Sequence, residues 1–398
     1  MNSLSGAKPQ KSFFRLLVSI DSIVILFYLF LSSPFLFSGI FFSDFLIPYI
    51  IKLFLGVFIY IRSLKYRVPA WSYGLICFCI IYTLIHAYLH PNSLAQSVAD
   101  LQDIMFCVFA WNIVMSKDNR DKYMRILLFL SFFVACILII ETFVFLFKPS
   151  TFSFQELVGY KVFYNSVLGM INIDNERPCW YFAEPSYCGA FLAINFFINR
   201  HHIFKKKFHK FIYYIVLLGG LLSTASFGAF VAIGITLCIL VFYRMVNLSN
   251  GILVVIITSI IYSYLILFPN LERDTDNTAI RTHSWEARQK KILIASEARK
   301  SMSFIDVILG QGNNAVGFKY ENGLSDAYNK LFIENGLIFM IIYFIVIFRL
   351  LKKDPVVLSY FLLSLMTVII QLFPLTFMCL FVARIIVEEK YKLIKEVQ

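Results

Sequence analysis

The chain has 398 residues, of which 59% are hydrophobic and only 15% are charged, and its mean hydropathy is +0.75. Ordinary soluble domains carry about 25% charged residues, so this composition excludes a fold whose whole surface meets water. The formal net charge of +12 does not by itself indicate nucleic acid binding, because the basic residues follow the apolar runs in the pattern of a membrane protein. We therefore expect an all-α integral membrane protein.

Twelve apolar runs come close to the length that about 30 Å of hydrocarbon requires of a helix. They lie at 16–34, 45–61, 71–89, 101–116, 126–147, 185–199, 211–224, 226–243, 251–268, 331–350, 355–372 and 374–388. We expect about twelve transmembrane helices in a single polytopic membrane domain that covers residues 1–398. Six of the eight cysteines lie well inside these runs, Cys188 lies close to the start of another and only Cys179 lies clearly in a loop, so the sequence predicts neither a disulfide framework nor a zinc site.

The basic residues predict the orientation, because short cytoplasmic loops are enriched in lysine and arginine. With the N-terminus inside, the inner segments hold 23 of the 36 basic residues, whereas the short outer turns near 35–44, 90–100 and 225 hold none. We expect a multi-pass protein of the inner (cytoplasmic) membrane with both termini in the cytoplasm.

Two outer segments are longer than the other loops, at 148–184 and 269–330. The second carries nine basic and eight acidic residues, which is typical of a solvated subdomain with amphipathic helices. Loops of this length are uncommon unless they contribute to function. The candidate functional residues lie in and next to these two loops.

The first group of candidates lies where the 148–184 loop returns to the membrane. Pro185 suits the first turn of a helix, which places Glu184 at that helix's N-terminus and Arg177 shortly before it. Arginine can bind a phosphate with a bidentate fork, and a carboxylate at this surface could position an acceptor hydroxyl. Trp180 and Tyr181 are candidate substrate-binding residues of the same segment. Alternatively, Glu184 is a helix cap and Arg177 contacts lipid phosphate.

The second group lies in the 269–330 loop, at Arg281, Trp285 and Arg288. Residues spaced i, i+4 and i+7 share one face of a helix, so two guanidinium groups would flank an indole. Arginine suits a diphosphate, and an aromatic ring suits the apolar face of a sugar. The alternative is a basic amphipathic helix lying on the bilayer, with Trp285 as its interfacial anchor.

The third group begins with the turn Gly310-Gln311-Gly312 and continues with Asp326 and Asn329 just before a new apolar helix. The glycines permit a tight turn, but a lone Gly-x-Gly is weak support for a nucleotide site. Asp326 is a candidate base for an acceptor hydroxyl, and Asn329 is a candidate substrate-binding residue. An N-cap role explains Asp326 equally well.

Other polar residues within apolar runs have simpler interpretations. His86 and His90 are four residues apart on one helix, but a metal site needs three or four ligands, so we interpret them as interfacial histidines and predict no metal site. Charged residues inside spans are functional candidates by default; for Asp21 and Lys52 the simpler interpretation is an ion pair between two helices.

Taken in order, these motifs resemble the O-antigen polymerase and ligase superfamily of bacterial polysaccharide assembly. The resemblance covers about 175–350 and rests on Arg177, Phe182-Ala183-Glu184-Pro185-Ser186, Leu222-Ser223-Thr224-Ala225-Ser226-Phe227-Gly228-Ala229, Arg281 with Trp285, Gly310-Gln311-Gly312, Asp326-Ala327-Tyr328-Asn329 and Glu334-Asn335-Gly336-Leu337. The chain has Phe227 where the family often has an arginine. It also lacks the histidine that ligase-like members show before the last motif's asparagine, which favours a polymerase.

The resemblance implies a glycosyltransferase-C-like membrane fold with a large extracytoplasmic helical loop, in a bacterial inner membrane. It implies transfer of oligosaccharide repeat units between undecaprenyl-diphosphate-linked intermediates at the periplasmic face, without metal or cofactor. Arg177, Arg281 and Arg288 would bind the diphosphate, and Glu184 or Asp326 would serve the acceptor. The implied partners are the lipid-linked oligosaccharide, the bilayer, and a chain-length regulator and flippase, but no nucleic acid.

Two other functions remain open. An O-antigen ligase is the alternative within the enzyme class. A lipid-linked oligosaccharide flippase is the alternative from another class, and it should carry charges deep in the spans and short loops on both sides. In this chain the charge is concentrated in two outer loops, which favours an enzyme.

Overall fold

The computed structural model describes residues 19–32, 46–66, 69–147, 182, 185–201, 207–224, 226, 229–230, 232–237, 291–312, 315–316, 326–365 and 374–397, and every structural statement below refers to these residues. The elements within these ranges are helices, which confirms the all-α prediction for the described part of the chain. The predicted helix at 251–268 lies outside the described residues, and the one at 226–243 lies there in part.

The helices of the N-terminal half are α2 (Ile20–Leu31), α4 (Leu46–Ser63), α5 (Ala70–Leu89), α6 (Leu94–Val114) and α7 (Arg120–Phe147). Those of the C-terminal half are α9 (Pro185–Ile198), α10 (Lys207–Thr224), α14 (Phe304–Leu309), α16 (Ala327–Leu351), α17 (Pro355–Ser364) and α18 (Pro374–Val397). Several begin or end outside the predicted apolar run: α6 and α7 start earlier, and α18 continues beyond 388. The apolar run marks the part of a helix that avoids water, whereas the backbone helix continues through polar turns at its ends.

Four of these helices have stretches long and apolar enough to cross a membrane, namely Ala70–Leu89, Ser97–Val114, Arg120–Phe143 and Ala327–Leu351. Three shorter apolar helices accompany them, at Ile20–Leu31, Ser186–Ile198 and Pro355–Ser364. The structure therefore supports a membrane protein, and the number of about twelve spans stays a prediction.

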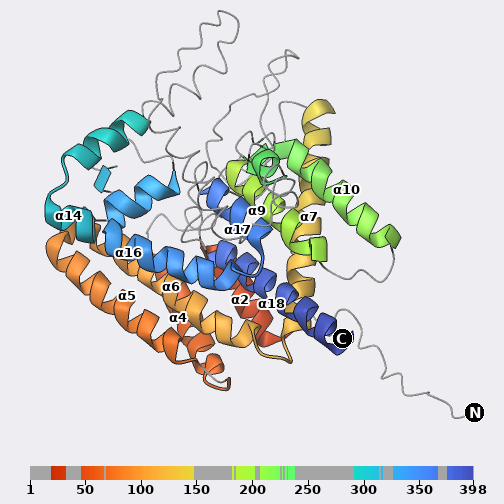
Figure 1. Ribbon diagram of the computed structural model, residues 1–398, viewed down its shortest axis with the longest axis horizontal. Helices are drawn as coiled ribbons and strands as arrows, with labels where there is room; N and C mark the ends of the chain where they lie inside the picture. Colours follow the sequence, from red (N-terminus) through yellow and green to blue (C-terminus); the bar gives the residue numbers. More distant parts are fainter. Residues whose placement is uncertain are drawn as a thin grey trace, which may run out of the picture.

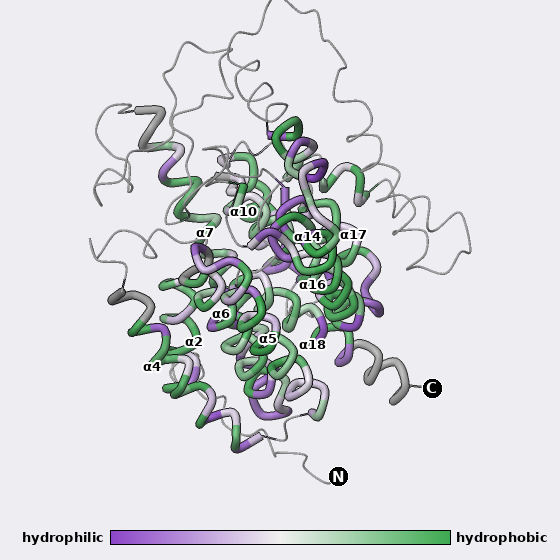
Figure 2. The backbone as a smooth tube through the Cα atoms, turned by 90° about the vertical axis from the view of Figure 1, so that its left-hand side faces the viewer, coloured by the Kyte–Doolittle hydropathy of each residue, from purple (hydrophilic) through white to green (hydrophobic). Residues whose placement is uncertain are grey.

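Most of the helices contribute side chains to one large buried core, and Figure 1 shows how these helices are arranged. α17 buries side chains around its whole circumference, from Val356 to Ser364, as expected for a helix that is apolar on every side. The outer helices instead expose large apolar side chains, such as Leu84 and Tyr88 on α5 and Ile345 on α16. Hydrophobic residues dominate the tubes of α5 and α16 in Figure 2, and an apolar outer surface of this kind suits lipid.

Two ion pairs connect α2, α4 and α6. Arg62 donates to both carboxylate oxygens of Asp21, over 2.6 and 2.9 Å, and Lys52 pairs with Asp103 at 2.6 Å. The predicted pair between Asp21 and Lys52 is therefore wrong. Asp21 lies in the first turn of α2 and Arg62 in the last turn of its neighbour α4, at the same end of the bundle, whereas Lys52 is ten residues earlier, about 15 Å along the axis.

Other contacts join segments that the sequence predicts to be cytoplasmic. Arg120 at the start of α7 pairs with Glu388 on α18 at 3.1 Å, and Arg200 after α9 pairs with Asp354 before α17 at 2.5 Å. Each contact joins two segments that the sequence places on the same side of the membrane, in agreement with that prediction.

α16 consists of two arms joined at Gly336, which has a φ of +69°. The ring of Tyr328 on the first arm stacks on Phe344 of the second, with centroids 5.6 Å apart, although 16 residues of straight helix would separate them by about 24 Å. The two arms meet beside α14 and diverge toward α17 (Figure 1). The backbone N–H of Ala327 donates to the carbonyl of Leu365 over 2.8 Å, so the first arm begins against the end of α17.

Candidate functional site

Seven of the predicted site residues lie outside the described residues: Arg177, Trp180, Tyr181, Glu184, Arg281, Trp285 and Arg288. The structure therefore does not place the proposed diphosphate-binding arginines. It does confirm the local prediction that α9 begins at Pro185. Asp326 and Asn329 are described, and they form the centre of the candidate site.

Asp326 is the N-cap of α16. Its Oδ1 accepts the backbone N–H of Asn329 over 2.8 Å, and its Oδ2 accepts the Nδ2 of the same residue over 2.8 Å. From the sequence we expected Asn329 just before the helix. It lies instead in the first turn of the helix, which begins at Ala327. The interpretation of Asp326 as a helix cap is confirmed. The cap does not exclude a chemical role, because the carboxylate also lies near the charge of Arg299.

The Nη1 of Arg299 donates to the Oδ1 of Asn329 over 2.5 Å. Residues 291–300 are helical, and the helix packs Ile294, Ala295 and Ala298 against Ile333 of α16 in a small second core. This core holds the 291–300 part of the 269–330 loop on the first arm of α16. The docked helix thereby places a guanidinium of the loop next to the N-terminus of α16.

The three side chains form a directed chain of hydrogen bonds from Arg299 through Asn329 to Asp326. A guanidinium can only donate and a carboxylate can only accept, so they fix the orientation of the Asn329 amide between them. Asp326 is only 7% exposed. Burial raises the pKa of the Asp326 carboxyl above its usual range, and the hydrogen bonds from Asn329 and the charge of Arg299 limit the rise.

The Gly310-Gln311-Gly312 turn packs directly on the bend of α16. The backbone N–H groups of Gln311 and Gly312 donate to the carbonyls of Ile333 and Glu334, just before the bend, over 2.8 and 3.1 Å. A Cβ at Gly310 would lie 2.3 Å from the Glu334 carbonyl oxygen. The glycines thus allow the backbone of the turn to touch the backbone of the bend.

α5 holds the same turn from the other side. The Tyr82 hydroxyl lies between two carbonyls, that of Leu309 at 2.8 Å and that of Asn335, which share its single proton. His86 Nε2 contacts the Leu309 carbonyl, and His90 Nε2 lies 3.1 Å from the Gly310 carbonyl. Because a carbonyl only accepts, both rings carry a proton on Nε2. The two histidines therefore bind backbone, and no group of three potential metal ligands occurs among the described residues.

Arg299 and Tyr82 are site residues that the sequence does not reveal. Arg299 is one of nine basic residues in its loop, and nothing in its spacing separates it from the others. Tyr82 lies in an apolar run, where an aromatic residue usually packs or faces lipid. The signal that could have located the bend is the Asn335-Gly336 dipeptide inside a helical pattern, since Asn-Gly commonly marks a turn.

The site thus contains a buried carboxylate with a raised pKa, a guanidinium linked to it through one amide, and an N-terminal helix end that favours negative charge. Such a carboxylate is a candidate for accepting a proton. No protein-family model, curated protein or solved structure matches this chain. The functional assignment consequently rests on the residues themselves.

Proposed function

We propose that the chain is an O-antigen polymerase, a metal-independent glycosyltransferase of the bacterial inner membrane. It transfers oligosaccharide repeat units between undecaprenyl-diphosphate-linked intermediates at the periplasmic face. The observation that carries the proposal is the hydrogen-bonded chain Arg299–Asn329–Asp326, at the junction of the long charged loop and an apolar helix. The ordered motifs of 175–350 support it.

The chemistry needs one base and several cations. The acceptor hydroxyl attacks the anomeric carbon of the donor sugar, a new glycosidic C–O bond forms, and the bond to the diphosphate breaks. Asp326 or Glu184 takes the hydroxyl proton, and the diphosphate leaves with the electron pair of the broken bond. Arg177, Arg281 and Arg288 stabilise the charge that develops on it.

Asp326 suits the role of base because its pKa is raised toward the working pH, where proton transfer is most efficient. Arg299 acts on Asp326 through Asn329 and is a positioning residue in this scheme. Trp180, Tyr181, Trp285 and Asn329 would bind the sugars. Glu184 remains the second candidate for the base.

The test uses the purified full-length chain in lipid vesicles with undecaprenyl-diphosphate-linked repeat units as the only substrate. We expect products with several repeats on one lipid, released undecaprenyl diphosphate in equal number to the new bonds, and no loss of rate with a metal chelator. The matched variants are Glu184→Gln and Asp326→Asn.

Three results would contradict the proposal, and two of them identify the alternatives. Transfer that occurs only after a lipid A–core acceptor is added indicates a ligase. Movement of the lipid across the bilayer without a new glycosidic bond indicates a flippase. If correctly folded protein shows no transfer and no movement of the lipid, this function is excluded altogether.

A further inference from the structure

Two large apolar side chains are exposed next to each other on a short helix of the 269–330 loop. In α14, Phe304 is 78% exposed and Ile305 is 57% exposed. In water, both would keep apolar surface hydrated at a cost in free energy. α14 lies at the edge of the helix bundle, beside the end of α5 and the bend of α16 (Figure 1). The depth of this edge in the bilayer therefore decides which medium the two side chains meet.

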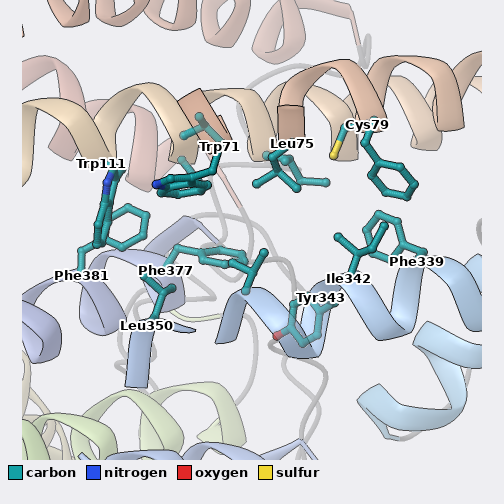
Figure 3. A pocket seen from close by; sticks show the side chains of 15 residues that line it. Trp71, Leu75, Cys79, Trp111, Phe339, Ile342, Tyr343, Leu350, Phe377 and Phe381 are labelled. Carbon is teal, nitrogen blue, oxygen red and sulfur yellow. The ribbon is translucent and has the colours of Figure 1, made fainter. Parts of the chain in front are cut away.

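α5 provides the scale for that depth. It has 20 residues, about 30 Å at 1.5 Å per residue, which matches the hydrocarbon core of a bilayer. One face of α5 is turned inward, where Trp71, Leu75 and Cys79 project toward α16 and α18 (Figure 3). The opposite face exposes apolar side chains along the whole helix, at Tyr73, Ile80, Ile81, Leu84 and Tyr88. Leu89, the last residue of α5, therefore marks the edge of the hydrocarbon.

Tyr82 and His86 continue the inward face of α5 and hold the end of α14 inside this edge. Both contact the carbonyl of Leu309, the last residue of α14, and the Tyr82 hydroxyl lies 2.8 Å from it. Tyr82 and His86 lie seven and three residues before Leu89, or about 10 and 5 Å along the helix axis. Leu309 therefore lies about 5 Å or more below the hydrocarbon edge.

This depth limits where Phe304 and Ile305 can lie. Phe304 is five residues before Leu309, so a helix pointing straight out of the bilayer would carry it about 8 Å outward. That position is about 3 Å beyond the hydrocarbon edge, and any tilt of α14 places Phe304 lower. The headgroup layer is about 5 Å thick or more on each side. Both residues therefore lie in the headgroup layer or below it.

The backbone of α14 is also suited to this position, because backbone polar groups near hydrocarbon need partners within the protein. At the outer end, Ser303 and Asp306 form a capping box in which each side chain accepts the backbone N–H of the other residue. At the deeper end, α5 binds the carbonyls of Leu309 and Gly310. The Gly310 turn also donates two backbone N–H groups to the bend of α16.

We propose that α14 is a membrane anchor, with Phe304 and Ile305 immersed at the boundary between headgroups and hydrocarbon in the leaflet at this end of α5. The partner is the bilayer itself, bound through apolar area and not through headgroup charge. Three residues join α14 to the helix 291–300, so the anchor also fixes the height of Arg299 relative to the hydrocarbon. The inference goes beyond the proposed function and does not depend on it.

The first experiment measures depth with spin labels on the full-length protein in phospholipid nanodiscs. In a chain with its eight native cysteines replaced, single nitroxides are attached at Phe304→Cys and Ile305→Cys. Leu84→Cys on α5 is the lipid reference, and the exposed Lys300→Cys is the water reference. We expect both α14 labels to collide with dissolved oxygen and to be shielded from a water-soluble nickel chelate, as at Leu84. Nickel access at both sites equal to that at Lys300 would overturn the proposal.

A photoreactive benzophenone attached to the same Phe304→Cys protein identifies the partner. We expect adducts with phospholipid on single copies of the chain. A covalent dimer as the main product would show that a second copy covers α14, and the proposal would fail.

A matched pair of double variants tests whether immersion holds the loop in place. Phe304→Ser with Ile305→Ser removes the apolar area, whereas Phe304→Leu with Ile305→Leu keeps most of it. Removing one large side chain from an apolar medium changes an equilibrium about tenfold or more. The serine pair should therefore raise hydrogen exchange at the Gln311 and Gly312 amides about tenfold, and the leucine pair should exchange like wild type. Equal exchange in the two variants, with thermal unfolding showing that both are folded, would contradict an anchoring role.

Discussion

At the scale of single residues, Asn329 determines how the two charged groups of the site are connected. Its amide oxygen accepts from Arg299 and its amide nitrogen donates to Asp326. An asparagine at 326 has only one side-chain oxygen. If that oxygen accepts the backbone N–H of Asn329, the new NH₂ group faces the Asn329 Nδ2; if it accepts from the Nδ2, the backbone N–H loses its acceptor. The chain therefore requires a carboxylate at 326 to satisfy all of its donors.

The charge of Arg299 should be visible in the pH dependence of transfer. Asp326 acts as a base only when it is ionised. Transfer should therefore be fast above the pKa of Asp326 and should slow as the pH falls below that pKa. Arg299 lowers that pKa, so Arg299→Gln should move the acidic limb of the pH–rate profile to higher pH, and Arg299→Lys should leave it nearer to wild type. Identical acidic limbs for wild type and Arg299→Gln would show that Asp326 is not the titrating group.

The sequence predicts Asp326 and Asn329 because a short polar motif precedes an apolar helix. It does not predict Arg299, which lies 27 residues before Asp326 and reaches the site only because Ile294, Ala295 and Ala298 dock their helix on Ile333. That docking depends on tertiary packing of small side chains, which no local spacing encodes.

At the scale of elements, the bend of α16 is the feature that builds the site. If α16 were straight through Gly336, its N-terminus with Asp326 would lie far from α17 and from the second arm. The bend instead brings Tyr328 against Phe344, and the Gly310 turn donates two backbone hydrogen bonds to the carbonyls just before it. The glycines at 310 and 336 both have positive φ, at 86° and 69°, and their backbones touch.

Alanine at Gly310 or Gly336 should therefore destabilise the protein. A Cβ at Gly336 would lie 2.4 Å from the Gly310 nitrogen, and a positive φ alone costs a non-glycine residue about 1–3 kcal/mol. We expect a clear fall in the thermal unfolding temperature of either variant in detergent.

Gly74→Ala on α5 and Gly56→Ala on α4 are the controls, because a Cβ there meets nothing within 4 Å. Each should be neutral or stabilise by up to about 1 kcal/mol, since alanine is the better helix former. If all four variants unfold at the same temperature, the backbone contact between the turn and the bend does not contribute to stability.

The long apolar runs predict most of the helices, because a membrane helix is apolar both on the face that meets lipid and on the face that packs against other helices. They do not predict the bend. The hydropathy of 331–350 reads as one continuous span, while the geometry changes at a single Asn-Gly pair whose partner is a turn more than twenty residues earlier.

At the scale of the whole molecule, several polar contacts lie at opposite ends of the helices, apart from the Lys52–Asp103 pair inside α4 and α6. Asp21 with Arg62 and Arg120 with Glu388 lie at the ends that the basic residues predict to be cytoplasmic. His90, at the end of α5, contacts the Gly310 turn of the loop that is predicted to be outside. The contacts therefore group the segments in the same way as the basic residues do, into one set predicted to be cytoplasmic and one set predicted to be outside.

Cysteine labelling can assign the two sides. In a chain with its eight native cysteines replaced, Lys300→Cys should react with a membrane-impermeant thiol reagent in intact spheroplasts. Asp118→Cys, in the exposed turn between α6 and α7, should react only after the membrane is permeabilised. The reverse pattern would invert the topology and place the Asp326 site in the cytoplasm, where it could not serve a periplasmic reaction.

The central claim is that Asp326 is the base of a glycosyl transfer between lipid-linked oligosaccharides, and the most direct measurement is the single-turnover rate of the purified Asp326→Asn protein. Asparagine keeps an acceptor for the helix cap but leaves one donor of Asn329 without its carboxylate, so the variant should lose about 1–3 kcal/mol of stability and remain folded. The loss of a general base should instead slow transfer about a hundredfold or more. Asp306→Asn, a carboxylate in the capping box of the neighbouring α14, is the matched control and should transfer at the wild-type rate. Transfer by Asp326→Asn at the wild-type rate would contradict the account.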